Sequence, residues 1–396
     1  MKTSAPEKYG FSPNRLKRID TAMQRYVDRK LLAGIVTLVA RRGRVLHFEK
    51  CGYQDLKTSK PMALDTIFRI YSMTKPITSV ALMMLFEHGL VRLTDPVTKF
   101  IPEFKKVRVF VNEGELTDLV RDITVHDLLM HTAGLSYGGY EETQMPVDKL
   151  YDRADLWSSD ITNQEMVRRI CELPLAYQPG QVWHYSVATD VVGYLVEVIS
   201  GLSLGSFFEE RIFKPLGMVD TGFTVPPDKV DRFATLYGLT ENDPLGVIDD
   251  AIGGDYFHTH LESGGGGLVS TAADYLRFSQ MLLNKGELDG VRLLGPRTVD
   301  LMTANHLPPA LMPMAMGGAR MPGFGFGLGF SVMMDVAQSG MLGSAGLHGW
   351  GGWASTHFWV GPQEQLIGIL MLQYIPSGTF PIRTDFRTLV YQALVD

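Results

Sequence analysis

Residues 68–76 read Phe68-Arg69-Ile70-Tyr71-Ser72-Met73-Thr74-Lys75-Pro76. This β-prone approach leads into an apolar segment, Ile77 to His88, which is predicted to be a helix with Gly89 as its C-terminal cap. We therefore expect Ser72 in the first turn of that helix, where the spacing of three places it on one face with Lys75. A serine becomes nucleophilic when a neighbour takes its proton, which a buried, neutral lysine can do. Alone, the stretch favours the simpler interpretation, in which Ser72 caps the helix and Lys75 is a solvated surface lysine.

The segments before this stretch predict a helix followed by two antiparallel strands. From Pro13 to Lys30 the apolar residues recur every three or four positions, which is typical of an amphipathic helix. Ala33 to Ala40 is a continuous apolar run, residues 41–44 form a turn, and Val45 to Phe48 is β-prone. Together these features predict a hairpin in a sheet that the first helix covers on one face.

The C-terminal part of the chain mirrors this pattern. Three β-like segments, separated by glycine or proline turns, precede a predicted helix from Phe386 to Val395. The segments are Gly325 to Met333, Gly351 to Val360 and Gln365 to Gln373. The middle of the chain, from about Lys75 to Leu268, is instead poor in strands and rich in helix boundaries. The sequence therefore predicts an α+β fold of the α/β sandwich type, with an antiparallel sheet flanked by terminal helices.

Two domains follow from this arrangement. We expect residues 1–75 and 269–396 to form the α/β domain from both chain ends, and residues 76–268 to form an inserted, mostly helical domain. Thr124 with Asp127, and Thr271 with Asp274, have the spacing of capping boxes and mark two helix starts. Because small molecules commonly bind between two such domains, the active site is expected in the cleft between them.

Four strings of the sequence together resemble a known group of enzymes. In chain order they are Ser72-Met73-Thr74-Lys75, then Leu128-Leu129-Met130-His131-Thr132-Ala133-Gly134-Leu135, then Pro179-Gly180 with Tyr185-Ser186, and finally His348-Gly349-Trp350-Gly351-Gly352. Their order and intervals are similar to those of serine β-lactamases, penicillin-binding proteins and family VIII carboxylesterases, over almost the whole chain. The resemblance implies the β-lactamase-like fold and an acyl-enzyme on Ser72, with Lys75 as its proton-handling partner.

The same resemblance assigns a role to Tyr185. It occupies the tyrosine of the group's Y-x-N motif, which relays a proton between the serine and the leaving group. The third position of the motif is Val187 in this chain. Members that recognise penicillin use an asparagine there to bind the substrate amide, so Val187 favours an ester substrate over a β-lactam. Without the resemblance, Tyr185 reads equally well as a half-buried aromatic residue at the start of a helix.

The group's third motif, K-T-G, has no matching lysine here. Trp350-Gly351-Gly352 is similar to the W-G-G form of family VIII carboxylesterases, which would place the second oxyanion donor at the backbone N–H of Trp353, beside that of Ser72. A shifted register would place His348 at the lysine position instead. A glycine-rich turn with packed aromatic residues is compatible with either, because backbone donors need small neighbours to approach a substrate.

Other segments offer competing sites. Gly201-Leu202-Ser203-Leu204-Gly205 matches the G-x-S-x-G elbow, but that motif needs a strand before the serine, whereas Asp190 to Ser200 is predicted to be a helix that Gly201 caps. His258, His260 and Glu262 lack a fourth ligand at a usual metal-binding spacing. The remaining features are predicted to be structural; they are the turn Gly264 to Gly267, which lacks the residues of a phosphate loop, and His131, which closes the helix from Thr124.

Composition narrows the class of function. With 45% hydrophobic and 20% charged residues and a net charge of −6 without a basic run, the chain is that of a folded protein that does not bind nucleic acid. It shows no signal-peptide core and no apolar stretch of membrane-spanning length, which predicts a soluble, cytoplasmic protein. Cys51 and Cys171 are expected to be reduced. One methionine-rich stretch fits an acyl pocket or ordinary core; it comprises Met312, Met314, Met316, Met321, Phe324 and Phe326.

These inferences predict a serine hydrolase that cleaves small carboxylic esters in two acyl-transfer steps, with Ser72, Lys75 and Tyr185 as catalytic residues. No metal or organic cofactor is expected. The same chemistry would also serve a β-lactamase, a D-amino-acid peptidase or amidase, or an acyltransferase, because the acceptor depends on pocket shape and on the exclusion of water. A fold retained as a non-catalytic binding module is the alternative of a different class.

Overall fold

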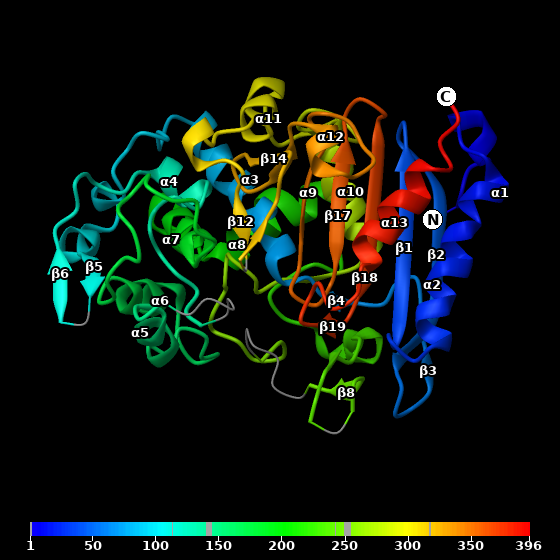
Figure 1. Ribbon diagram of the computed structural model, residues 1–396, viewed down its shortest axis with the longest axis horizontal. Helices are drawn as coiled ribbons and strands as arrows, with labels where there is room; N and C mark the ends of the chain where they lie inside the picture. The colour runs from blue at the N-terminus through cyan, green and yellow to red at the C-terminus, as the bar shows by residue number, and fades with distance from the viewer. Residues whose placement is uncertain (1, 113, 140–144, 242, 249–254, 317) are drawn as a thin grey trace.

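The large antiparallel sheet of the computed structural model joins both ends of the chain (Figure 1). The structure describes all residues except 1, 113, 140–144, 242, 249–254 and 317. β1 pairs with β18, so that Ile35 lies opposite Leu372 and Arg41 opposite Leu366. In spatial order the strands are β14 (Phe324–Phe326), β15 (Ser331–Met333), β16 (His348–Gly351), β17 (His357–Gly361), β18 (Leu366–Leu372), β1 (Gly34–Arg41), β2 (Arg44–Asp55) and β3 (Lys60–Pro61).

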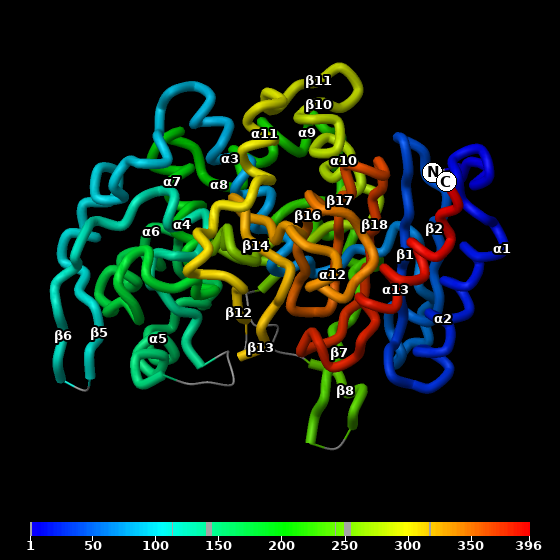
Figure 2. The backbone as a smooth tube through the Cα atoms, turned by 45° about the horizontal axis from the view of Figure 1, so that its top comes forward, coloured from blue at the N-terminus to red at the C-terminus, as the bar shows by residue number. Residues whose placement is uncertain are grey.

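Helices cover both faces of this sheet (Figure 1). α2 (Arg18–Asp28) buries Ile19 and Met23, contacts β2 and packs against α13 (Ile382–Tyr391), which crosses the sheet at β18. α10 (Ala272–Leu283) contacts β17, β18 and β1 from behind in this view. Figure 2 shows both termini on the side of the molecule that carries α1 and β2; there Phe11 forms a β-bridge with Leu394, and Arg41 of β1 pairs with Asp396 at 2.5 Å. The predicted α+β fold, with an antiparallel sheet flanked by terminal helices, is confirmed.

The predicted boundaries of several elements are wrong, and local turns explain the differences. Gly325–Met333 is two short strands, β14 and β15, because Gly329 turns the chain at a φ of 92°. Gly351–Val360 is likewise broken between β16 and β17, where the N–H of Gly352 donates to the carbonyl of Thr356 across a turn. The helix expected at 386–395 begins and ends earlier, at Ile382 and Tyr391.

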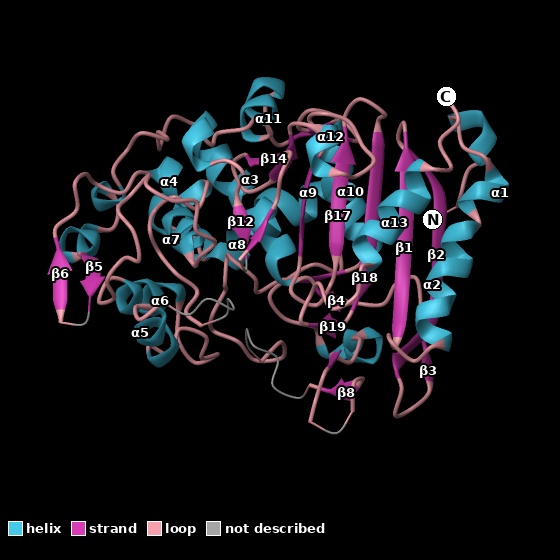
Figure 3. Ribbon diagram, viewed as in Figure 1, coloured by secondary structure: helices cyan, strands magenta, loops and turns pink. Residues whose placement is uncertain are grey.

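The chain between the N-terminal strands of the sheet (β1 to β3) and its C-terminal strands (β14 to β18) forms a mostly helical part that contains few strands (Figure 3). α3 (Thr74–Glu87) packs against α7 (Ala188–Ser200), which also contacts the shorter helices around it. α3 is buried on nearly every side, since its first ten residues, from Thr74 to Met83, are all buried. The other helices are α1 (Pro13–Leu16), α4 (Val125–Leu129), α5 (Asp148–Arg153), α6 (Asn163–Ile170), α8 (Leu204–Phe208), α9 (Lys214–Leu216), α11 (Pro296–Met302) and α12 (Val336–Ser339).

The short strands outside the main sheet form small pairs. β4 pairs with β9 and carries the chain toward the start of α3. These pairs are β4 (Phe68–Arg69) with β9 (Val269–Ser270), β5 (Val109–Asn112) with β6 (Glu115–Thr117), β10 (Glu287–Leu288) with β11 (Val291–Arg292), β12 (Ala315–Met316) with β13 (Ala319–Arg320), and β7 (Tyr237–Gly238) with both β8 (Gly246–Val247) and β19 (Tyr374–Ile375). The division of the chain at residues 75 and 268 into two domains stays a prediction.

The two predicted capping boxes have different outcomes. Thr124 and Asp127 form the complete capping box of α4, with both reciprocal hydrogen bonds. Thr271 accepts from the N–H of Asp274, which is only half of the predicted box, because the Asp274 carboxylate accepts from the N–H of Asp220 instead. Among the described helices no single one is long and apolar enough to cross a membrane; α7 and Leu204–Leu216 meet that test together only across a bend of 79°.

Candidate active site

The nucleophile candidate lies in a strained turn before α3. Ser72 belongs to a 3₁₀ turn, η2 (Tyr71–Met73), so it precedes the α-helix instead of lying in its first turn as predicted. Tyr71 has a φ of +42°, which is unusual for a residue with a bulky side chain. Packing holds the turn on both sides, since the Tyr71 ring meets Trp353 edge to face at 5.6 Å and the Tyr275 hydroxyl donates to the Met73 carbonyl at 2.8 Å. The turn therefore presents the half-buried Ser72 from a fixed backbone.

Lys75 is buried against Ser72, with 1% of its side chain exposed. Its Nζ lies 3.2 Å from the Ser72 Oγ, 2.8 Å from the Tyr137 hydroxyl and 2.7 Å from the carbonyl oxygen of Gly265. A neutral amine has two N–H donors and one lone pair, and the Gly265 carbonyl can only accept. If the second N–H donates to Tyr137, the lone pair is left for the Ser72 hydroxyl. The burial that the sequence required of Lys75 is present, and the solvated-lysine alternative is wrong.

Tyr185 lies on the other side of the Lys75 amine, three residues before α7 begins at Ala188. Its side chain is 9% exposed, and the Lys75 Nζ lies 4.7 Å from the centre of its ring. The phenol oxygen accepts a hydrogen bond of 3.3 Å from the indole N–H of Trp350. Val187, two residues on, is fully buried and offers no polar group to a substrate. Tyr185 is thus held by its neighbours with its hydroxyl at the pocket that contains Ser72.

A pocket of about 190 Å³ opens beside Ser72 and Tyr185. Two methionines, from β12 and the segment after β13, form part of its wall, and the indoles of Trp350 and Trp353 add further apolar surface. Met314 and Phe326 of the methionine-rich stretch are buried in the core instead, so that stretch divides between the two predicted roles. The pocket residues from these two segments are Met316 and Met321.

The W-G-G segment lines the same pocket at the end of β16. Trp350 and Gly351 are the last two residues of the strand, and Gly352 and Trp353 begin the turn that follows. A Cβ on Gly352 would lie 2.3 Å from the carbonyl oxygen of Ile70, so only glycine lets this turn approach the backbone before Ser72. His348 is 2% exposed and packs on Phe330 at 5.5 Å, away from the pocket wall, which favours the Trp350 register over the His348 register.

His131 lies behind Tyr185 in the position of a packing residue. It follows α4 at a φ of +56°, is fully buried, and its ring lies 4.9 Å from that of Tyr185. Burial is the largest cause that holds the pKa of His131 well below its usual range, so the ring is neutral near pH 7. Its Nδ1 lies 3.4 Å from the Ser186 hydroxyl. These contacts support the predicted structural role.

Three residues that the sequence did not single out belong to the surroundings of Lys75. Tyr137 contacts the amine through its hydroxyl, two residues after the string that ends at Leu135. Gly265 accepts from the amine, although its glycine run was interpreted only as a turn. Asp190, in the first turn of α7, accepts from the N–H of Gly265 at 3.0 Å. Asp190 follows Tyr185 closely in the sequence, at the start of a predicted helix. This short separation was the signal by which sequence analysis could have identified Asp190.

The competing sites are dispersed in the structure. Ser203 is exposed, follows the end of α7 rather than a strand, and caps α8 by accepting from the N–H of Ser206, so the elbow reading is wrong. His258 and His260 are exposed, whereas the Glu262 carboxylate accepts from the N–H of Gly205. In the part of the chain that the structure describes, no three histidine, cysteine, aspartate or glutamate side chains are grouped to hold a metal ion.

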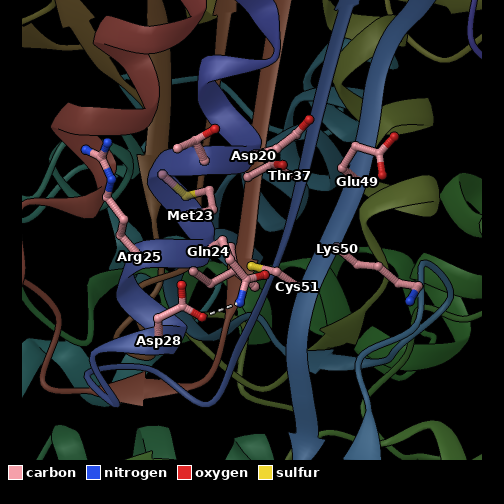
Figure 4. Close-up of a pocket in the computed structure, with 11 residues that line it drawn as sticks. Asp20, Met23, Gln24, Arg25, Asp28, Thr37, Glu49, Lys50 and Cys51 are labelled. Atoms are coloured by element: carbon pink, nitrogen blue, oxygen red, sulfur yellow. Dashed lines mark hydrogen bonds between the residues drawn. The ribbon is translucent and has the colours of Figure 1, made fainter.

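A second hollow, of about 640 Å³, lies between α2 and the strands β1 and β2 (Figure 4). Its wall carries Asp20, Glu49 and Cys51, and Gln24 donates to Asp28 across its lower part at 2.8 Å. Burial and nearby carboxylates raise the pKa of the Cys51 thiol to about 12, so it stays protonated and weakly nucleophilic. This hollow shares no lining residue with the pocket at Ser72 and has no activated nucleophile.

The fold and the buried pair of Ser72 and Lys75 are those of a serine hydrolase with a β-lactamase-like fold, and comparison with known proteins gives the same class. Residues 19–392 match the Beta-lactamase family, and the chain belongs to this family. It is 38% identical over 365 residues to Protein Rv1367c of Mycobacterium tuberculosis, with 88% of each chain covered. It is 32% identical over 375 residues to Esterase EstB of Burkholderia gladioli, which covers 90% of this chain and 89% of EstB.

A solved structure extends the comparison to three dimensions. It is that of "EstCE1, a hydrolase with promiscuous acyltransferase activity", which superposes with a TM-score of 0.81 at 28% sequence identity. The match covers 96% of this chain and 99% of EstCE1. The similarity therefore includes both the sheet and the helical part, and the β-lactamase-like fold expected from the four strings is confirmed.

Proposed function

We propose that this protein is a serine esterase that hydrolyses small carboxylic esters through an acyl-enzyme on Ser72. The observation that carries the proposal is the contact between a buried amine and a serine hydroxyl, 3.2 Å from the Lys75 Nζ to the Ser72 Oγ, at a pocket that Tyr185 also lines. The name of EstB, a 32% identical esterase, supports the same chemistry. An activated nucleophile within hydrogen-bond reach of its base is the arrangement that covalent catalysis needs.

In the acylation step the Ser72 Oγ attacks the ester carbonyl carbon as its proton passes to the Lys75 amine. The carbonyl oxygen becomes an oxyanion, and the backbone N–H groups of Ser72 and Trp353 are the donors we assign to it. When the C–O bond of the ester breaks, the alcohol takes a proton from Lys75 through the Tyr185 hydroxyl. Water then attacks the acyl carbon as its proton passes through the Tyr185 hydroxyl to Lys75. The Ser72 Oγ takes that proton back as its bond to the acyl carbon breaks, and the acid leaves.

The walls of the pocket favour esters over β-lactams. Trp350 and Trp353 place indole surface where the resemblance would otherwise require the lysine of K-T-G, and Val187 stands in place of an asparagine that binds an amide. A site lacking the polar partners of a substrate amide loses affinity for it, because the amide is then buried without hydrogen bonds. We expect the β-lactam nitrocefin to be turned over far more slowly than a short p-nitrophenyl ester.

Acyl transfer to an alcohol is a second candidate function. EstCE1 is a hydrolase with promiscuous acyltransferase activity, and the mostly apolar wall at Ser72 would favour an organic acceptor over water. The two functions share every step up to the acyl-enzyme and differ in what attacks it. When ethanol is added to the assay, the amounts of free acid and of new ethyl ester measure how much acyl-enzyme reacts with water and how much with the alcohol. If only acid forms at every ethanol concentration, the protein is a hydrolase and not an acyltransferase.

Labelling with a fluorophosphonate tests the proposed function directly. The probe should phosphonylate Ser72 of the wild-type protein, since only an activated serine attacks it at a useful rate. Mass spectrometry of a digest locates the label, and prior incubation with an ester substrate should slow its appearance. A label on a peptide without Ser72 would move the active site elsewhere, and no label on any peptide would support the binding-module alternative.

Replacing Tyr185 by phenylalanine tests the proton path to the leaving group. The ring and its contacts with Lys75 remain in Tyr185→Phe, so we expect a folded enzyme whose melting temperature falls only by the lost hydrogen bond from Trp350, and a kcat that falls about 10²- to 10³-fold. The loss should be smaller for esters of acidic alcohols, which leave without a proton. Tyr194→Phe, on the outer part of α7, is the matched control and should keep full activity. A Tyr185→Phe enzyme with the wild-type kcat on an alkyl ester would exclude the proposed relay.

A further inference from the structure

Asp190 is a buried carboxylate that the proposed mechanism does not use. It lies in the first turn of α7 and is 2% exposed. One carboxylate oxygen accepts from the Ser263 hydroxyl at 2.5 Å and from the N–H of Gly265 at 3.0 Å. The other oxygen, Oδ2, has no hydrogen bond within the described residues. An incompletely satisfied buried carboxylate is costly, so its presence calls for a compensating interaction.

The amine of Lys75, which can compensate the carboxylate once it is protonated, lies on the far side of one peptide group. The Gly265 residue that donates its N–H to Asp190 accepts, through its carbonyl, from the Lys75 Nζ at 2.7 Å. Thr78 of α3 holds the preceding carbonyl, of Gly264, at 2.7 Å. A Cβ on Gly265 would lie 2.3 Å from the Asp190 carboxylate, which shows how closely the carboxylate approaches this peptide. A continuous series of hydrogen bonds thus runs from Asp190 through the Gly265 peptide to Lys75 and Ser72.

We propose that Asp190 is a positioning residue for Lys75, and this inference rests on the proposed function. By holding the Gly265 peptide, it keeps a carbonyl acceptor on one N–H of the amine, so that the lone pair is directed at the Ser72 hydroxyl. When Ser72 attacks, its proton bonds to that lone pair and the amine becomes an ammonium ion. The negative charge of Asp190 then stabilises the buried ammonium, where Coulomb interactions are stronger than in water.

The other titratable groups around Lys75 do not offer this charge. The amine faces Asp190 from α7, Tyr137 and His131 from the segment after α4, and Tyr185. Burial raises the pKa of the Asp190 carboxyl, and Lys75 opposes that rise when its amine is protonated. The His131 ring is neutral, since burial holds its pKa well below the usual range. Of these four side chains, Asp190 is the one carboxylate.

The test compares Asp190→Asn with Asp274→Asn. Asp274 is a matched control because it too is a buried carboxylate that accepts from a hydroxyl, of Thr221, and from a backbone N–H, of Asp220, at the start of α10. The readout is the second-order rate of fluorophosphonate labelling of Ser72 across a pH series, together with kcat and KM for p-nitrophenyl butyrate and the melting temperature of each variant.

For Asp190→Asn we expect labelling and kcat to fall about 10- to 100-fold, with KM within about twofold of the wild-type value. The acid limb of the labelling rate should move to lower pH, because a base that loses a neighbouring negative charge holds its proton less tightly. Asp274→Asn should label like the wild type at every pH. A merely structural Asp190 would change the melting temperature without moving the pH profile.

Equal labelling rates and equal pH profiles for Asp190→Asn and the wild type would overturn this inference. If that variant does not fold, Ser263→Ala removes one hydrogen bond to the same carboxylate and leaves its charge in place. It should slow labelling about three- to tenfold without moving the acid limb, and an unchanged rate would also overturn the inference. Absence of label on Ser72 in the wild type would instead contradict the proposed function.

Discussion

The Ser72→Ala variant should lose ester hydrolysis almost completely, with kcat for p-nitrophenyl butyrate falling at least about 10⁴-fold. Ser72 supplies the oxygen of the acyl-enzyme, and of the three serines described at this pocket it is the one that hydrogen-bonds a lysine. The substitution removes one half-buried hydroxyl from a turn whose backbone is held by Tyr71 and Met73, so the fold should be unaffected. Steady-state kinetics and a thermal unfolding curve on the same preparation separate lost chemistry from lost structure.

Ser203→Ala is the control for this experiment. Ser203 belongs to the alternative G-x-S-x-G motif but is an exposed N-cap of α8, whose hydroxyl accepts from the N–H of Ser206. Its loss should lower stability by about 1 kcal/mol and leave kcat unchanged. The opposite pattern, with activity retained in Ser72→Ala and lost in Ser203→Ala, would refute the assignment of the nucleophile.

Lys75→Met is expected to have the second largest effect, a fall in kcat of about 10³-fold. Methionine has a similar length and suits a buried position, but it has no lone pair that takes the Ser72 proton at neutral pH. The fluorophosphonate probe should also label Ser72 in this variant about 10³-fold more slowly, because labelling needs the same activated hydroxyl. Stopped-time labelling and steady-state kinetics measure the two effects independently.

Lys75→Arg separates proton transfer from charge. Arginine keeps a positive charge near Ser72 but stays protonated at any working pH, so it cannot act as a base. We expect it to be as inactive as Lys75→Met. An arginine variant with more than about a tenth of the wild-type kcat would show that Lys75 acts by its charge alone, and the proton path we propose would be wrong.

Much of the fold could be predicted because its signals are local. Three such signals are the amphipathic period of α2, the apolar run of β1 and the glycine at position 201, which ends α7. Each depends only on residues that are neighbours in the sequence, and the structure has each element near its expected place. The errors fall where chain direction depends on distant partners. The turn from Gly352 to Thr356, for instance, is shaped by the approach of Gly352 to the Ile70 carbonyl.

The sequence by itself determined that Ser72 and Lys75 lie three residues apart where a helix begins, and that residues 350–353 form a glycine-containing segment flanked by tryptophans. It could not show what surrounds the amine, because those contacts join residues far apart in the chain. Tyr137 lies 62 residues from Lys75 and Gly265 lies 190 residues away, yet both hydrogen-bond its Nζ. Only the packing of α3 against α7 and against the segments that carry Tyr137 and Gly265 brings these groups within 3 Å of the amine, since long-range contacts arise from burial of many side chains together rather than from any local pattern.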